Sequence, residues 1–101
     1  MRIRNKPWAK QELNSSKIYI KNPEEFKGKW KEKFGNNNPI YLELGCGKGS
    51  FISELAFRNQ NTNYIAIDLV DAMLGLAKRK IEEKYNENNT KVDNLVLVRY
   101  D

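Results

Sequence analysis

The sequence predicts an α/β protein: one half of a doubly wound parallel sheet, preceded by a basic arm and one helix. Three short apolar runs, at 40–44, 64–67 and 95–98, are typical of strands. Segments with helical periodicity separate them, over 50–59 and 71–85. Strands joined through helices run parallel, and right-handed crossovers then predict the strand order 3-2-1.

Residues 1–21 show no sustained period, and we predict a basic N-terminal arm there. Trp8 is the one large apolar anchor of this arm. We interpret Trp8 as a buried residue that pins the arm, with base stacking as the alternative.

A helix is predicted to follow the arm. Asn22 can cap it, Pro23 suits its first position, and Glu25 stands where a capping-box carboxylate belongs. Gly35 ends it. One apolar stripe, which we interpret as packing, runs along this helix: Phe26, Trp30 and Phe34.

The later elements follow the same logic. The second strand ends at Asp68, and Asp71 can cap the third helix. In a complete doubly wound sheet the first strand is central, yet nothing follows Asp101. We therefore expect residues 22–101 to be the first half of a cofactor-binding domain, in a chain cut from a longer protein after its third strand. Alone, such a chain should be marginally stable, or should pair its open apolar edge with another chain.

Composition sets broad limits. The 101 residues form at most one small domain, and a hydrophobic content of 40% is enough for a core. The single Cys rules out an internal disulfide and fits a reducing cytoplasm. No apolar run approaches the ~18 residues of a membrane span, and no secretory signal is apparent.

Positive charge is concentrated at the start of the chain. Residues 1–33 hold ten Lys or Arg and four Asp or Glu, whereas residues 34–101 hold eight and nine. This asymmetry suggests a polyanionic partner, most simply nucleic acid, with an ordinary solvated arm as the alternative.

A glycine-rich segment lies between the first strand and the next helix: Glu43-Leu44-Gly45-Cys46-Gly47-Lys48-Gly49. Without side chains the backbone can approach a ligand, and the helix start offers unpaired N–H groups. The spacing is G-x-G-x-G, whereas the dinucleotide fingerprint would need glycine at position 50, where Ser50 stands. The loop therefore favours S-adenosylmethionine (AdoMet) over a nicotinamide cofactor.

Three acids stand at or near the carboxyl ends of the predicted strands, where α/β sheets bind ligands. Asp68 follows Gly49 by 19 residues, close to the ~20-residue offset of a ribose-binding acid. We expect Asp101 to accept from an adenine amino group, and Glu43 to face the cationic methionine end. Cys46 is interpreted as a small filler, because the chain has no His to activate it.

These residues resemble bacterial tRNA (guanine-N7-)-methyltransferases, over essentially all of the chain. The glycine loop is common to many class I methyltransferases, and the arm is the specific part. The similar segments are residues 2–9, 22–23, 27–30, 34–36 and 38–40, the glycine loop, Phe51, residues 63–65, and residues 94–101.

The resemblance implies a cytoplasmic, AdoMet-dependent enzyme with a Rossmann-like fold that methylates N7 of a guanine in tRNA. It implies that Glu43, Asp68 and Asp101 contact AdoMet, with Gly45, Gly47 and Gly49 shaping the loop. Asp68 departs from the usual Glu of the family. The family's later Pro-Trp motif is absent, so we expect no catalytic residue, no turnover and at best weak AdoMet binding in this chain alone. We expect no metal site.

Contacts to tRNA phosphates would come from the arm, through Arg2, Arg4, Lys6 and Lys10. Guanine N7 carries a lone pair and no proton, so methyl transfer to it needs no general base. Two other readings stay open: a nicotinamide-dependent enzyme half, and a non-catalytic RNA-binding module.

Overall fold

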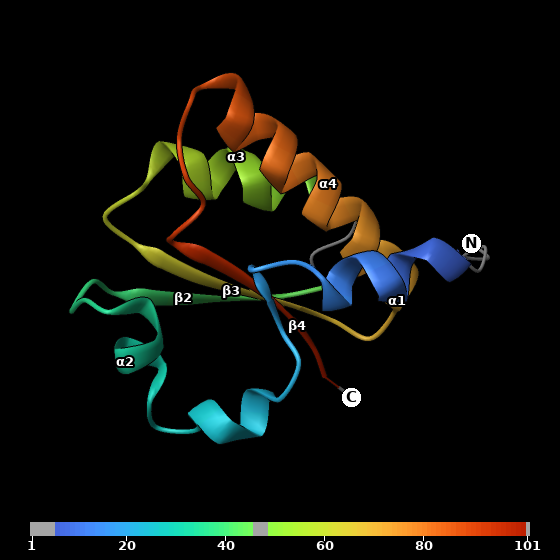
Figure 1. The fold of residues 1–101 in the computed structure, drawn as a ribbon. Coiled ribbons are helices and arrows are strands. Elements are labelled where there is room, and N and C mark those ends of the chain that lie inside the picture. Colours follow the sequence, from blue (N-terminus) through green and yellow to red (C-terminus); the bar gives the residue numbers. More distant parts are fainter. Residues whose placement is uncertain (1–5, 46–48, 101) are drawn as a thin grey trace.

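The computed structural model describes residues 6–45 and 49–100, and these form one four-stranded parallel sheet with helices on both faces (Figure 1). The strands are β1 (Tyr19–Ile20), β2 (Ile40–Leu44), β3 (Asn63–Asp68) and β4 (Leu95–Arg99). The helices are α1 (Pro7–Asn14), the 3₁₀ helix η1 (Pro23–Phe26), α2 (Trp30–Phe34), α3 (Ser50–Arg58) and α4 (Asp71–Glu87).

The sheet order is β1-β4-β3-β2, and every neighbouring pair is parallel. The three predicted strands therefore lie in the predicted order 3-2-1, and the α/β fold class is confirmed. A fourth strand, β1, was not predicted. It adds two residues to the outer side of β4, where Tyr19 pairs with Leu97.

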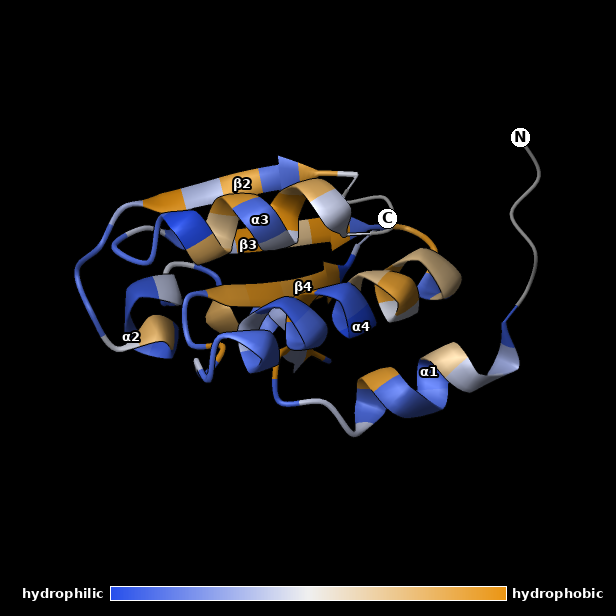
Figure 2. Cartoon of the chain, turned by 90° about the horizontal axis from the view of Figure 1, so that it is seen from above, coloured by the Kyte–Doolittle hydropathy of each residue, from blue (hydrophilic) through white to orange (hydrophobic). Residues whose placement is uncertain are grey.

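Two apolar clusters hold the layers together (Figure 2). The larger one lies between the sheet and α3 and α4, and α1 adds Leu13 to it. The smaller one covers the other sheet face, where the side chains of Ile65, Val96 and Val98 meet Trp30 and Phe34. β3 and β4 are thus buried on both faces, as central parallel strands require.

The arm predicted over residues 1–21 contains α1 and β1, so from residue 7 it is part of the packed fold. Pro7 occupies a first helical position, and Ala9 and Leu13 are fully buried one turn apart. Two apolar positions in eight residues are too few to reveal a period. Trp8 is half-buried rather than fully buried, and it packs on α4, with the Arg79 guanidinium carbon 3.6 Å from its ring centroid.

The single helix predicted after Asn22 is broken into η1 and α2. Gly28 interrupts it with a φ of +76°, and the Asn22 side chain makes no capping hydrogen bond. Gly35 ends α2 in the left-handed conformation, as predicted. The aromatic stripe still packs on the apolar cluster of the sheet face, and the rings of Phe26 and Trp30 lie 5.5 Å apart between centroids.

A buried amide joins the elements at the amino edge of the sheet. The Asn94 side chain donates to the carbonyls of Ala56 and Thr62 and accepts a 2.6 Å hydrogen bond from the Tyr85 hydroxyl. Burial raises the pKa of Tyr85 well above its ordinary value. This polar network fixes one edge of the sheet, and the opposite edge carries the candidate site.

Candidate functional site

Two of the predicted acids lie on one face of the sheet, near its carboxyl edge. Glu43 on β2 is in register with Ala66 on β3, and Asp68 stands two residues beyond Ala66. Side chains two residues apart share a face, so Glu43 and Asp68 project to the same side, the side of α3 and α4. Strand spacing and rise place their Cα atoms about 8 Å apart.

The glycine loop begins against β3. The Gly45 amide donates to the Ile67 carbonyl at 2.7 Å, which extends the pairing of β2 and β3 by one residue. Gly45 has a φ of +77°, and a Cβ built on it would meet no atom of the described residues within 4 Å. The loop backbone is therefore open to a ligand at this position. Gly47, Cys46 and Lys48 lie outside the described residues.

The loop ends against α4. Gly49 has a φ of +89°, and a Cβ there would lie 2.5 Å from the Ala77 Cα. No side chain fits this approach of backbone to backbone. Gly49 is also the residue before the first turn of α3, so this contact sets where the helix start points.

Asp68 is the last residue of β3 and is half-buried. Its Oδ1 accepts a 3.2 Å hydrogen bond from the Val70 amide, which shapes the turn into α4. Asp71 does not cap α4 as predicted; it is the first residue of the helix. Its carboxylate pairs instead with Arg99 Nε at 3.5 Å, which ties the start of α4 to the end of β4.

Tyr41 is a neighbour of the candidate site that was not predicted. It lies two residues before Glu43 on the same face of β2, and its ring lies 5.6 Å from that of Tyr64. The charge of Glu43, together with a hydrogen bond between the two side chains, raises the pKa of Tyr41. Strand alternation could have identified this neighbour, because i and i+2 share a face.

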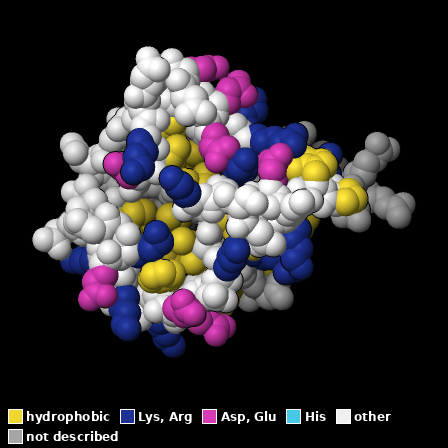
Figure 3. All heavy atoms as spheres, in the orientation of Figure 1, with side chains coloured by type: hydrophobic (Ala, Val, Ile, Leu, Met, Phe, Trp, Pro, Cys, Tyr) yellow, Lys and Arg dark blue, Asp and Glu magenta, His cyan; other side chains and the backbone are white. Residues whose placement is uncertain are grey.

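The remaining predicted site residues lie at the two ends of the chain. Asp101, Arg2 and Arg4 lie outside the described residues. Lys6 immediately precedes α1, and Lys10 is exposed on α1. In Figure 3 lysine and arginine side chains are spread over the visible face, around exposed apolar side chains.

The acidic side chains and the glycine backbone fit an adenosyl ligand. Carboxylates such as Asp68 can accept hydrogen bonds from paired hydroxyls, and Glu43 can attract an ammonium group. The glycine backbone between them leaves space that a Cβ at Gly45 would enter. No helix within the described part of the chain is long and apolar enough to cross a bilayer.

Parallel strands, a glycine loop after β2 and carboxylates near the strand ends are the features with which α/β proteins bind nucleotide-type ligands at the carboxyl edge. Residues 37–101 match the family described as "Putative methyltransferase". The match spans well over half of the chain, so the chain belongs to this methyltransferase family.

Curated relatives are similar over nearly the whole chain. A tRNA (guanine-N(7)-)-methyltransferase of Clostridium beijerinckii is 58% identical over 98 residues, which cover 97% of this chain and 45% of the relative. One from Ruminiclostridium cellulolyticum is 60% identical over 87 residues, covering 86% and 37%. The chain thus spans less than half the length of these relatives.

A solved structure shares the fold. An antibiotic-related methyltransferase is 30% identical to this chain, with a TM-score of 0.56, and the match covers 73% of this chain and 36% of that one. The fold assignment therefore agrees with the family assignment.

Proposed function

We propose that the protein transfers a methyl group from AdoMet to N7 of a guanine in tRNA. The observation that carries this proposal is the 58% identity to a tRNA (guanine-N(7)-)-methyltransferase over 97% of the chain. The glycine loop, Glu43 and Asp68 give a physical reason for the proposal, since together they would make a site suited to the cofactor. This chain would contribute the cofactor-binding half of the activity.

Four described residues would hold the cofactor. Asp68 would accept from the ribose hydroxyls, and Glu43 would face the ammonium of the methionine end. Gly45 and Gly49 would shape the backbone beneath it, and Asp101, in line with the family resemblance, would accept from the adenine amino group. When bound, AdoMet supplies a methyl group made electrophilic by a sulfonium.

The chemistry makes modest demands on side chains. Guanine N7 has an in-plane lone pair and no proton to lose, so positioning and tolerance of a cationic product are the main requirements. The acids Glu43 and Asp68 supply negative charge near the reacting centre. A chain without histidine is consistent with this reaction, because no general base takes part.

The basic start of the chain would contact tRNA phosphates through Arg2, Arg4, Lys6 and Lys10. Such contacts position the RNA without reading its sequence. A cytoplasmic location follows from the same proposal, because tRNA is modified there and the single Cys forms no internal disulfide.

Self-association is a further part of the proposal. β2 pairs with β3 on one side only, and its apolar side chains are exposed, with Leu42 at 53% and Leu44 at 71%. An exposed apolar edge is a template for pairing with another strand. In the chain as described, a second copy would satisfy this edge.

A methyl-transfer assay tests the proposed function. The protein expressed from its whole reading frame is incubated with methyl-labelled AdoMet and unmodified tRNA transcript, and N7-methylguanine is mapped by chemical cleavage at that base. We expect label at one guanine, and a large loss of it with Asp68→Ala. Label at another atom, or undiminished label with Asp68→Ala, would overturn the proposal.

Calorimetry separates the cofactors. The chain is expected to bind AdoMet and to give no heat with NADH. Binding of NADH without AdoMet would instead favour a nicotinamide enzyme.

A further inference from the structure

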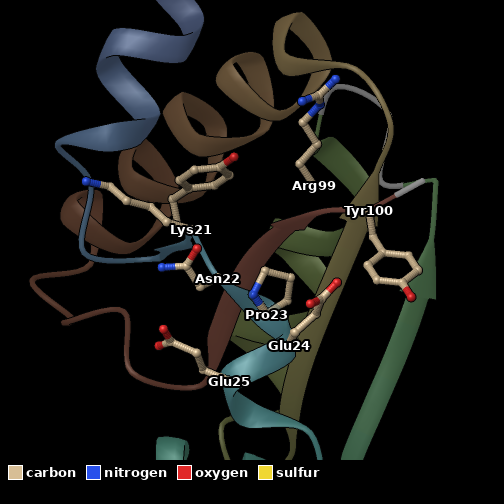
Figure 4. A pocket seen from close by; sticks show the side chains of 8 residues that line it. Lys21, Asn22, Pro23, Glu24, Glu25, Arg99 and Tyr100 are labelled. Atoms are coloured by element: carbon tan, nitrogen blue, oxygen red, sulfur yellow. The ribbon is translucent and has the colours of Figure 1, made fainter.

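A hollow separate from the glycine loop lies at the carboxyl edge of the sheet, beside the ends of β1 and β4 (Figure 4). Its volume is about 620 Å³, within the range of about 300–1,000 Å³ for small-molecule sites. It is lined by Tyr19, residues 21–25, Arg99 and Tyr100. The glycine loop follows β2, and strand spacing puts the hollow about 10–14 Å from that loop.

The end of β4 divides this hollow into two sides. Arg99 points to the α4 side, where its Nε donates to the Leu69 carbonyl at 3.2 Å and pairs with Asp71. Tyr100 follows Arg99 and points to the η1 side, with 54% of its surface exposed. Glu24 reaches toward Tyr100 from η1 (Figure 4). The hollow therefore lies over the carboxyl end of β4, between Arg99 and Tyr100.

The lining combines three kinds of group. Lys21 and Arg99 are cationic, Glu24 and Glu25 are anionic, and Tyr100 offers an exposed ring. Arg99 is already paired with Asp71. None of the ion pairs between described residues includes Lys21, so Lys21 is the cation that can pair with an anionic ligand. The formal charges balance, so a bare anion is disfavoured.

A nucleotide satisfies all three kinds of group at once. Its phosphate is an anion for Lys21, its base has a face that stacks on a tyrosine, and an amino-bearing base edge donates to a carboxylate such as Glu24. The wall from Tyr19 to Glu25 also belongs to residues 1–33, the segment that carries the excess positive charge. An RNA held by that segment would pass this hollow.

We propose that this hollow is a subsite for one nucleotide of the RNA substrate, other than the nucleotide that is methylated. The inference rests on the proposed function, because it takes the substrate to be RNA. Lys21 contacts the phosphate, Tyr100 stacks on the base, and Glu24 accepts from an amino group on the base edge.

Salt-dependent binding of tRNA transcript to the full chain tests the phosphate contact. Lys21→Ala is expected to reduce the slope of log affinity against log salt by about 1, as loss of one phosphate contact does. The matched control is Lys91→Ala, since Lys91 is also exposed but precedes β4 at the opposite edge of the sheet. Equal slopes for the two variants would overturn the subsite.

The stacking contact has its own pair of variants. Tyr100→Leu is expected to weaken tRNA binding about fivefold or more, whereas Tyr100→Phe, which keeps the ring, is expected to bind as the wild type does. Glu24→Gln should change the preference among short RNAs that differ in one base, and Glu87→Gln at the end of α4 should not. Equal binding by Tyr100→Leu and the wild type would contradict stacking.

AdoMet calorimetry on the same proteins separates this inference from the proposed function. If the wild-type chain binds AdoMet and tRNA while Lys21→Ala and Lys91→Ala behave alike, the subsite is wrong and the proposed function stands. If the wild type binds neither ligand, both are wrong. Free guanosine monophosphate serves as a competitor. If it binds tightly but its addition leaves the affinity for tRNA unchanged, the assignment of the hollow to RNA is wrong.

Discussion

Gly49 links the glycine loop to the framework of the protein. Its backbone lies so near to Ala77 on α4 that a Cβ would come within 2.5 Å of the Ala77 Cα. A Cβ built on Gly45, at the other end of the loop, would meet no atom of the described residues within 4 Å. The two glycines therefore have different roles: Gly49 fixes the loop against α4, and Gly45 leaves the ligand side open.

Gly49→Ala is expected to lower the free energy of unfolding by about 2–4 kcal/mol, because overpacking against backbone adds to the strain of a positive φ. Gly35→Ala is the matched control. Gly35 has a φ of +76° with no atom within 4 Å of a built Cβ, so it should cost only about 1–2 kcal/mol. Urea unfolding measures both, and equal losses would show that the contact with Ala77 contributes nothing.

Tyr41 and Glu43 show how the fold constrains a site residue. The two share one face of β2, and Tyr41 in turn rests on Tyr64, which is only 3% exposed. The Glu43 carboxylate is thus flanked by a hydroxyl on its own strand. The negative charge of Glu43 acts on that hydroxyl and raises the pKa of Tyr41.

At the scale of elements, α1 is attached to α4 by charge as well as by packing. The Glu12 carboxylate accepts from Arg79 at 2.7 Å and lies 3.4 Å from Lys78 Nζ. Arg79 also covers the Trp8 ring. The hydrogen bond from Arg79 holds the pKa of Glu12 below its ordinary value of 4.5, and Lys78 adds to the effect.

This ion-pair cluster predicts a specific acid dependence of stability. Because the pKa of Glu12 is lowered by folding, its contribution is complete above the ordinary value of 4.5 and is lost as pH falls through the lowered value. Wild type should therefore exceed Glu12→Gln in stability near neutral pH, and the gap should close in acid. Urea unfolding across this range measures the gap.

The control for this prediction is Glu83→Gln, an exposed residue of α4 outside the cluster. The difference in unfolding free energy between Glu83→Gln and the wild type should stay nearly constant over the same pH range. A gap for Glu12→Gln that widens in acid would contradict the assigned sign.

Elements with strong local signals were predictable, and those made by tertiary contact were not. β3 and β4 are continuous apolar runs because both faces are buried, and α4 shows a helical period over 17 residues. β1 has two residues and exists only through its pairing with β4. The break at Gly28 depends on a positive φ that the aromatic periodicity conceals.

The placement of two candidate site residues was predictable for a related reason. Parallel strands bring their carboxyl ends to one edge, so Glu43 and Asp68 could be placed together from strand order alone. Tyr41 was missed because its role depends on a side-chain contact with Glu43 rather than on a motif. The hollow beside β1 was missed because β1 itself was not predicted.

At the scale of the molecule, the sheet is covered unevenly. β3 and β4 are protected on both faces, whereas β2 carries exposed apolar side chains along an unpaired edge. The structure therefore agrees with the expectation that the first predicted strand is an open edge. Pairing of two such edges would bury this surface.

Leu42→Lys is expected to reduce self-association, because a charged side chain on an edge strand opposes pairing. Leu69→Lys is the control, since Leu69 is 56% exposed but lies after β3, away from the edge. Light scattering during gel filtration, over a range of protein concentration, gives the mass of each variant. A wild-type mass that stays monomeric at every concentration would contradict edge pairing.

The central claim is that the ends of β2 and β3 and the glycine loop form one cofactor site. Titration of the ¹⁵N-labelled chain with AdoMet, followed by amide chemical shifts, tests it most directly. We expect shifts grouped at residues 43–50 and 68–71, with residues 59–63 at the opposite edge unchanged. Shifts confined to that opposite edge, or a response to NADH with none to AdoMet, would contradict it.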